Sequence, residues 1–436
     1  MPFVSPVWHP CSQMKDYEVF PPLPVKSAKG CYIELEDGRK IIDAISSWWC
    51  KSLGHNHSTL KQALIEQTEK FEHVILANTI HQNIIELSKK LANLTQTLDK
   101  VMYASDGSSI IEIAIKMSIH ARQILGQTYK TEIISLENSY HGETALALSV
   151  SDVGLYRKPY KPLLKQYHFV KNIPYVNSRW DPLWKDCSEY WYEIEKELNP
   201  KAHTLTAVII EPIVQGTGGM RIYSQDFLKR LGQWCTSHDV HLIADEIMTG
   251  FGRTGFPLAC QHAGVEPDFL CLGKGLTAGW LPMSALVTSH SIYQLFYDEY
   301  ETGKAFMHSH TYAGNALAAA VALACFEVYE KENIYQQVQD KEPLMYELMR
   351  GIAEQTHTLH NVRYIGGVVA ADIVGPSNQR LGYQVYRKAV ELGALLRPLG
   401  NTLYWLPPLN ITREELIQLF EITKIAVRIL NVGKGG

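Results

Sequence analysis

The sequence predicts an α/β protein built around a mostly parallel β-sheet, with a smaller α+β unit attached to it. From about residue 99 onward, short apolar segments alternate with longer helical stretches, which is the pattern of strand–helix–strand units. Residues 206–210 are almost continuously apolar, as expected for a strand buried on both faces. Polar or charged residues directly follow several of these segments, and in open α/β sheets ligands bind beyond the carboxyl ends of the strands.

The composition is that of a large globular protein. The 436 residues are 46% hydrophobic, which is enough for two domains, or for one large domain with a smaller one built on it. With Lys+Arg at 41 against Asp+Glu at 45, the net charge of -4 leaves no basic surplus for nucleic acid. The eight cysteines are scattered without a C-x-x-C pair, which favours reduced thiols in a cytoplasm over a zinc site or disulfide framework. We expect neither a signal peptide nor a membrane span.

The elements are expected in the following order. Residues 31–45 predict a β-hairpin, and helices are expected over 58–71 and 82–94. The next part alternates between strands and helices, with strands at 101–104, 132–136, 206–210, 240–244, 268–272 and 283–288, and helices at 108–121 and 224–237.

The remaining segments complete two expected domains. Residues 172–204 are rich in Trp, Tyr, Pro and Asn without a clear period, and we expect an insertion over the sheet. An alanine-rich helix is expected from residue 315 to about 329, followed by a helix at 333–355, strands near 363–374 and a helix at 412–430. We expect a large domain over residues 55–320 and a small domain made of residues 1–54 and 321–436.

Asp245 and Lys274 are the most informative pair of residues. Asp245 ends the apolar segment 240–244, Lys274 follows the strand 268–272, and the glycine-rich block 250–255 lies between them. A lysine amine forms a Schiff base with an aldehyde, and a carboxylate keeps a pyridine nitrogen protonated, as pyridoxal phosphate (PLP) chemistry requires. A lone lysine or aspartate is typical of a protein surface, but the two in this order, with the glycine-rich block between them, are a far more specific indication of PLP chemistry.

Three other groups follow expected strands. The run of small residues 104–109 predicts either a phosphate cradle at a helix start or an ordinary capped helix. Tyr140 follows a strand, where it is either a stacking surface for a flat ring or a core residue. Glu211 directly follows residues 206–210. The ends of parallel strands meet at one edge of a sheet, so these groups are expected near Asp245 and Lys274.

Two other classes of site are disfavoured. The close histidine pairs 55/57, 238/241 and 308/310 do not stand at i, i+4 on an expected helix beside a carboxylate, so no metal site is expected. Residues 216–219 lack the spacing of a dinucleotide fingerprint or a phosphate-binding P-loop, which weighs against a nicotinamide dehydrogenase.

Taken together, these motifs resemble the class III (ω-type) aminotransferases, which are PLP-dependent transferases of fold type I. The resemblance rests on residues 245–255 followed by Gly273-Lys274-Gly275. More narrowly, the chain resembles the branch that acts on 8-amino-7-oxononanoate in biotin synthesis. That likeness runs over nearly the whole chain and rests on Trp8-His9-Pro10, Ser46-Ser47-Trp48-Trp49, Tyr140-His141-Gly142, Ala305-Phe306-Met307-His308 and Leu396-Arg397-Pro398.

The resemblance implies roles for the cofactor-binding residues. Lys274 forms the Schiff base and moves the proton, and Asp245 pairs with the ring nitrogen. The remaining residues implied to hold PLP are Gly107, Ser108, Tyr140 and Glu211, together with His310 and Thr311. The last two are expected to reach the cofactor of a partner subunit, so the resemblance implies a homodimer with shared active sites.

The resemblance also implies a substrate channel. Tyr140 touches the substrate, Trp48 lines the path of its aliphatic tail with Ser309 nearby, and Arg397 grips its carboxylate through two-pronged donor geometry. Cys11, a further expected substrate residue, directly follows His9-Pro10, where family members with a preference for S-adenosylmethionine often carry tyrosine. Ser309-His310 also replaces a Gly-Pro found in some members.

The expected reaction is a ping-pong amino transfer that converts 8-amino-7-oxononanoate to 7,8-diaminononanoate. S-adenosylmethionine is the expected amino donor, and lysine is the alternative. Other class III activities remain open, on ω-amino acids, ornithine, 4-aminobutyrate or a semialdehyde, as does a catalytically silent PLP-binding protein.

Overall fold

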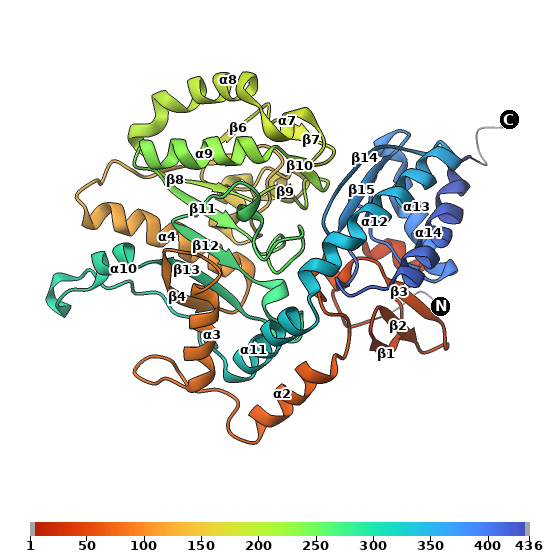
Figure 1. The fold of residues 1–436 in the computed structure, drawn as a ribbon, viewed down its shortest axis with the longest axis horizontal. Helices are drawn as coiled ribbons and strands as arrows, with labels where there is room; N and C mark the ends of the chain where they lie inside the picture. Colours follow the sequence, from red (N-terminus) through yellow and green to blue (C-terminus); the bar gives the residue numbers. More distant parts are fainter. Residues whose placement is uncertain (1–4, 432–436) are drawn as a thin grey trace.

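A seven-stranded sheet forms the centre of the computed structural model, which describes residues 5–431 (Figure 1). In spatial order its strands are β4 (Leu98–Ala104), β13 (Ser284–Ser289), β12 (Phe269–Leu272), β11 (His241–Asp245), β8 (Leu205–Ile210), β5 (Glu132–Leu136) and β6 (His168–Val170). Only β13 runs antiparallel to its neighbours; the pairs between β12 and β6 are all parallel. The predicted α/β class and mostly parallel sheet are confirmed.

Helices cover both faces of this sheet, which explains the apolar strands. All six residues of β8 are buried, and alternate side chains point to opposite faces. Ala207 and Ile209 belong to the apolar cluster around α4 (Gly107–Ile124), whereas Val208 and Ile210 belong to the cluster that includes α9 (Gln225–Ser237). This two-sided burial explains why β8 is apolar at every position except Thr206.

The segment 172–204 is more regular than expected. It contains β7 (Tyr175–Val176), α7 (Pro182–Lys185) and α8 (Ser188–Leu198). The expectation of no clear period was wrong, because Trp191, Ile194 and Leu198 form one buried face of α8. The Trp191 ring packs 6.2 Å from Phe227 of α9, so α8 covers the outer side of α9. β7 pairs with β10 (Arg221–Tyr223), which also pairs with β9 (Val214–Gln215).

Segments from both ends of the chain form the smaller part of the fold, on the right of Figure 1. Its first sheet contains β1 (Val25–Lys29), β2 (Tyr32–Leu35), β3 (Lys40–Asp43) and β16 (Ala394–Leu395). Its second contains β14 (Leu359–Ile365), β15 (Val368–Ile373) and β17 (Thr402–Trp405), with helices α12 (Ile334–Thr356), α13 (Leu381–Leu392) and α14 (Arg413–Arg428) packed beside them. The predicted hairpin of β2 and β3 is confirmed; α13, β16 and β17 were not predicted.

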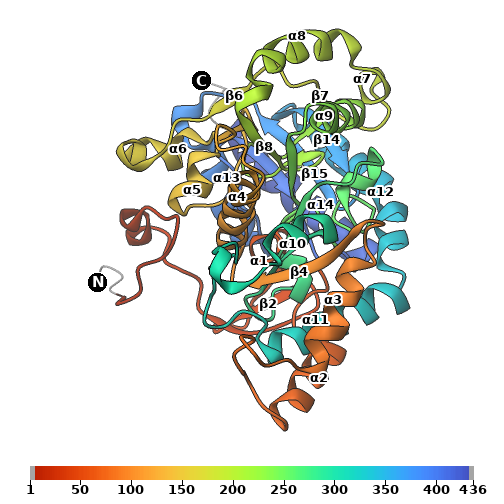
Figure 2. The same cartoon turned by 90° about the vertical axis from the view of Figure 1, so that its left-hand side faces the viewer.

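The remaining helices connect the two parts and surround them. The predicted helices near 58, 82 and 315 are confirmed as α2 (Ser58–Thr68), α3 (Gln82–Ala92) and α11 (Ala316–Lys331). Shorter helices are α1 (Ser46–Trp49), α5 (Ala145–Ser149), α6 (Gly154–Arg157) and α10 (His290–Phe296). Figure 2 shows the amino-terminal segment, in red, on the same side as α5 and α6. Within residues 5–431, no helix combines the length and apolarity that crossing a bilayer requires.

Candidate active site

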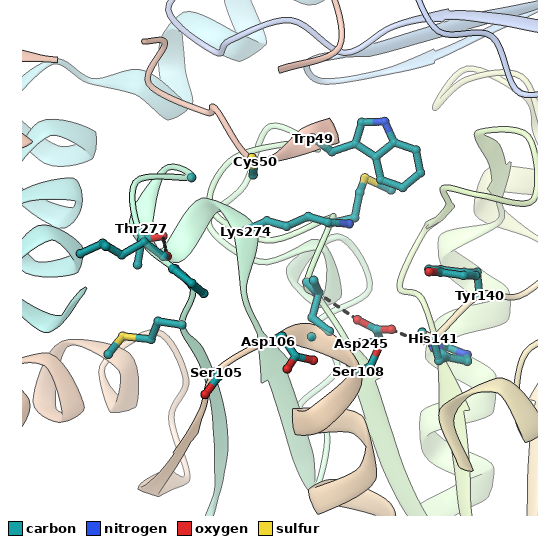
Figure 3. A pocket seen from close by; sticks show the side chains of 18 of the residues that line it. Trp49, Cys50, Ser105, Asp106, Ser108, Tyr140, His141, Asp245, Lys274 and Thr277 are labelled. Atoms are coloured by element: carbon teal, nitrogen blue, oxygen red, sulfur yellow. Dashed lines mark hydrogen bonds and ion pairs between the residues drawn. The ribbon is translucent and has the colours of Figure 1, made fainter. Parts of the chain in front are cut away.

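A cavity of about 440 Å³ opens beyond the carboxyl ends of β11 and β12 (Figure 3). This volume lies within the range of small-molecule sites. Seven residues expected from the sequence to lie near the cofactor line it, namely Ser105, Gly107, Ser108, Tyr140, Glu211, Asp245 and Lys274. Residues that follow neighbouring strands thus meet at one edge of the sheet, as expected from the sequence.

Lys274 extends into the cavity from the first position of a short 3-10 helix (Lys274–Thr277) that follows β12. In Figure 3 its side chain passes between Trp49 and Asp245, and its Nζ lies 4.6 Å from the centre of the Trp49 ring. Burial lowers the pKa of Lys274, and the nearby carboxylates of Asp245 and Glu211 oppose this shift only partly. A larger fraction of this amine is therefore neutral than in an ordinary lysine, and the neutral amine is the nucleophilic form.

Asp245 ends β11 with its carboxylate held on both sides. Its Oδ2 lies 2.8 Å from Nδ1 of His141, and its Oδ1 accepts a hydrogen bond of 3.2 Å from the backbone N–H of Ile247. The other ring nitrogen of His141 lies 3.3 Å from Ser135 Oγ in β5. These contacts fix the orientation of a carboxylate that is only 6% exposed. The sequence-based prediction missed His141, although it stands next to Tyr140 in the same motif.

The amino terminus of α4 forms one wall of the cavity. Asp106 caps this helix of 18 residues, and the backbone at Gly107 and Ser108 faces the cavity. A helix amino terminus attracts anions through its free N–H groups and dipole. Gly142 packs against it at φ +125, and a Cβ there would lie 2.2 Å from Ser108 Oγ. The backbone N–H of Glu143 donates to the same Oγ at 3.2 Å, so two loops meet at this wall.

Glu211 supports the loop that carries Tyr140. One of its carboxylate oxygens accepts from the backbone N–H of Tyr140 and the other from that of Gly216, each at 2.9 Å. Burial, with a smaller contribution from the charge of Asp245, raises the pKa of Glu211 to about 8. The Tyr140 hydroxyl donates to Oε1 of Glu143 at 3.0 Å.

A second chamber, of about 430 Å³, continues from the first and shares Trp49, Tyr140 and Lys274 with it. It contains three further expected substrate residues, Cys11, Trp48 and Arg397. The guanidinium of Arg397 lies 4.5 Å from the centre of the Trp48 ring, and its Nη2 donates to the carbonyl oxygen of Cys11 at 2.9 Å.

Tyr156 of α6 also lines this second chamber, although no periodic pattern in the sequence indicated it. Its ring lies 5.9 Å from that of Tyr140. Burial and the neighbouring Cys11 thiol raise its pKa to about 12. A phenol therefore stands beside the cysteine in this chamber.

Three expected site residues lie elsewhere in the single chain. Neither chamber is lined by Ser309, His310 or Thr311. Ser309 and Thr311 are exposed, and the Thr311 carbonyl oxygen lies 2.8 Å from Nε2 of His73. His310 stacks on His308. Among residues 5–431, no group of three or more His, Cys, Asp or Glu is arranged to hold a metal ion.

The residues around the first chamber fit PLP. Lys274 offers an amine for its aldehyde, Asp245 a carboxylate for its ring nitrogen, and the amino terminus of α4 a site for its phosphate. The close approach of Gly142 to Ser108 leaves no room for a larger residue at position 142 behind the amino terminus of α4.

Comparison with known proteins agrees with this fit. The family model "Aminotransferase class-III" matches residues 13–427. An adenosylmethionine-8-amino-7-oxononanoate aminotransferase from Helicobacter pylori is 41% identical over 421 residues, which cover 94% of this chain and 93% of the relative. An Aquifex aeolicus protein of the same name is 36% identical, with 97% of this chain and 95% of the relative covered.

Solved structures agree as well. The crystal structure of the enzyme of that name from Methanocaldococcus jannaschii is 34% identical, covers 97% of each chain and has a TM-score of 0.90. An amine transaminase from an uncultivated Pseudomonas species, in its PLP-bound form, is 28% identical with a TM-score of 0.90, over 98% of this chain and 99% of that one. The match to the family model over nearly the whole chain, together with the fit of the cavity, shows that this chain is a PLP-dependent enzyme of the class III aminotransferase family.

Proposed function

We propose that this aminotransferase converts 8-amino-7-oxononanoate to 7,8-diaminononanoate in biotin synthesis, with S-adenosylmethionine as amino donor. The observation that carries the proposal is the group of relatives with this activity in their names, which are 31–41% identical over at least 94% of this chain. The second chamber supports it, because Lys274 and a cationic group for a substrate carboxylate, Arg397, line the same space.

We propose the following cofactor contacts. When bound, PLP supplies an electron sink for the substrate carbon that loses its proton. The carboxylate of Asp245, held by His141, would keep the ring nitrogen protonated, and Gly107 and Ser108 would hold the phosphate. Tyr140 packs on the ring, and Glu211 acts on the cofactor indirectly, by holding the backbone of Tyr140.

Lys274 is proposed to take the proton from the substrate carbon and to hold it at Nζ. An amine whose pKa is lowered by burial gives up and takes back a proton more readily near neutral pH than an ordinary lysine. The Trp49 ring, 4.6 Å from Nζ, shields the amine from water and stabilises its charged form.

Arg397 is the proposed anchor for both substrates. The oxo acid and an amino-acid donor each carry a carboxylate, and one binding group can therefore serve both halves of a ping-pong reaction. The aliphatic tail of the oxo acid would lie along Trp48 and Trp49, which line the second chamber. Lysine, the alternative donor, also carries a carboxylate for the same anchor.

We also propose a homodimer in which Ser309, His310 and Thr311 of each chain complete the site of the partner. Their position outside both chambers of their own chain supports this arrangement. Mixing Lys274→Ala chains with Thr311→Ala chains tests it. If Thr311 acts across the interface, hybrid dimers contain one intact site and regain activity; if it acts within its own chain, mixing restores nothing.

Two further proposals concern organisation and location. The division into residues 55–320 and the paired segments 1–54 and 321–436 is supported by the parallel pairing of β3 with β16. A cytoplasmic location, with neither membrane nor nucleic acid as partner, is supported by eight unpaired cysteines and a net charge of -4.

Product identification tests the proposed function. Purified enzyme with PLP, 8-amino-7-oxononanoate and one donor is analysed by mass spectrometry, with Lys274→Ala as matched control. We expect 7,8-diaminononanoate with S-adenosylmethionine and none with the variant. If product forms with lysine and not with S-adenosylmethionine, lysine is the amino donor and the proposed reaction stands. Absence of product with both donors, while ornithine or 4-aminobutyrate is turned over, would reject the proposed substrate.

A further inference from the structure

Residues 46–49 form a left-handed turn that contains no glycine. The φ angles of Ser46, Ser47, Trp48 and Trp49 are 50, 45, 73 and 73 degrees. In this region the Cβ of an L-residue crowds the following carbonyl oxygen, so single residues visit it and consecutive residues rarely do. Such a conformation persists only where surrounding contacts over-determine it, and it is concentrated at functional sites.

Asp43 supplies those contacts. It is the last residue of β3 and is completely buried. Its carboxylate accepts hydrogen bonds from the backbone N–H of Ser47 at 2.9 Å, from Ser47 Oγ at 2.6 Å and from the backbone N–H of Ile45 at 3.3 Å. Nε2 of His55 lies 2.9 Å from the same carboxylate. Asp43 thus holds both Ile45, which directly precedes the turn, and Ser47, the second residue of the turn.

The far side of the turn is braced by β17 and the residue that follows it. Ser46 Oγ donates to the carbonyl oxygen of Leu406 at 2.8 Å, and the indole N–H of Trp49 donates to the Tyr404 hydroxyl at 3.0 Å. The turn is therefore fixed at its start by Asp43 and at its end by Tyr404.

The turn presents its two tryptophans to the active site. The Trp49 ring lies 4.6 Å from Nζ of Lys274, and the Trp48 ring lies 4.5 Å from the guanidinium of Arg397. Asp43 itself lines neither chamber. The strand of Asp43 pairs in parallel with β16, in which Leu395 stands opposite Asp43. Trp48 and Arg397 therefore both follow the ends of neighbouring parallel strands, which brings them close together.

We propose that Asp43 is a positioning residue of this active site. Through Ser47 it holds the turn in its left-handed form, and the turn sets Trp49 against Lys274 and Trp48 against Arg397. If the four residues changed to right-handed angles, their Cα–Cβ directions would rotate and both indoles would leave these positions. The inference rests on the proposed roles of Lys274 and Arg397.

Amide hydrogen exchange in the apoenzyme tests the structural part of this proposal. Asp43→Asn keeps the shape of the side chain but weakens its bonds to Ser47. Asp37→Asn is the matched control, because Asp37 lies in the same hairpin, is exposed and contacts Arg39. We expect exchange in the peptide 44–51 to accelerate on the order of tenfold in Asp43→Asn, as for a lost hydrogen bond to a charged group, and to stay unchanged in the control.

Kinetics of the PLP-loaded enzyme test the functional part. Misplacement of groups by about 1 Å at a reacting centre costs on the order of 10²-fold in rate. We expect Asp43→Asn to lower kcat by about this factor and also to raise KM for the oxo acid, because both indoles move. Ser47→Ala, which keeps the carboxylate and removes one of its bonds, should show smaller changes of the same kind. It also replaces Asp43→Asn if that variant fails to fold.

The possible outcomes test the role of Asp43 and the proposed function separately. Native exchange in peptide 44–51 and native kinetics in both variants would overturn the positioning role. Faster exchange throughout the smaller sheets, with no excess in this peptide, would also overturn it and make Asp43 a general core residue. If wild-type enzyme fails to act on the proposed substrates, the proposed function fails; the exchange experiment still decides the role of Asp43.

Discussion

Replacing Gly142 by alanine should weaken PLP binding, because this glycine packs against Ser108 at the proposed phosphate site. Its φ of +125 is one that L side chains rarely adopt, and the strain of such a residue is about 1–3 kcal/mol. The added Cβ would also lie 2.2 Å from Ser108 Oγ, 2.8 Å from its Cβ and 3.0 Å from its Cα. Rotation of the serine hydroxyl cannot relieve all three contacts, so the start of α4 must move.

The size of the loss of PLP affinity follows from how far the start of α4 must move. The Cβ–Oγ contact is more than 1 Å short of the 3.4 Å at which ordinary van der Waals contact begins. A shift of about 1 Å at a catalytic centre lowers the reaction rate on the order of 10²-fold. We expect a loss of PLP affinity of similar size from the shift of α4. The dissociation constant for PLP should therefore rise about 100-fold, equivalent to about 2.7 kcal/mol.

Titration of the apoenzyme with PLP, followed by absorbance, measures this effect. Gly154→Ala is the matched control, because Gly154 begins α6 near the same chambers and an added Cβ there meets no atom within 4 Å. Thermal melts of both apoenzymes show whether either variant is unfolded. A folded Gly142→Ala enzyme with the PLP affinity of the wild type would refute the assignment of this wall to the phosphate.

Three further predictions follow from the same site. Lys274→Ala should lose turnover by at least about 10²–10⁴-fold, the range for a lost acid–base group, while PLP still binds without a covalent bond; absorbance spectra and turnover assays measure both. Arg397→Lys should raise KM for the oxo acid about tenfold and leave kcat nearly unchanged, because lysine lacks the two-pronged donor; steady-state kinetics decide this, and a fall in kcat alone would contradict it. Burial raises the pKa of Glu211 from 4.5 to about 8. Between these pH values the folded apoenzyme keeps a proton that the unfolded chain releases, so the stability of the fold decreases as pH rises. Glu211→Gln should flatten the dependence of Tm on pH over this range, and an unchanged slope would count against the pKa shift.

Local patterns in the sequence predicted the central sheet and the cofactor chamber. Asp245 and Lys274 could be placed because parallel strands end at the same edge, so a residue following an apolar segment has a known position in space. The segment around α8 was not recognised, because aromatic residues occupy its exposed as well as its buried side. Tyr190 and Tyr192 are exposed while Trp191 between them is buried, which hides the helical period.

The supporting residues of the site could not be predicted in the same way. His141 acts through a contact with Asp245 across 104 positions of the chain, and Asp43 acts through a backbone conformation that no propensity indicates. The sequence motif gave a role to Trp48 and none to Trp49, yet the Trp49 ring lies 4.6 Å from Nζ of Lys274. These roles arise from tertiary contacts between strands that are distant in the sequence.

The half-reactions of the PLP-loaded enzyme, followed by absorbance, test the central claim most directly. Enzyme is mixed with S-adenosylmethionine, the excess donor is removed, and 8-amino-7-oxononanoate is added. The account predicts that the cofactor band bleaches with the donor and returns with the oxo acid, because one chamber with Lys274 and Arg397 takes both substrates in turn. Bleaching by ornithine or 4-aminobutyrate, with no return on adding 8-amino-7-oxononanoate, would contradict it.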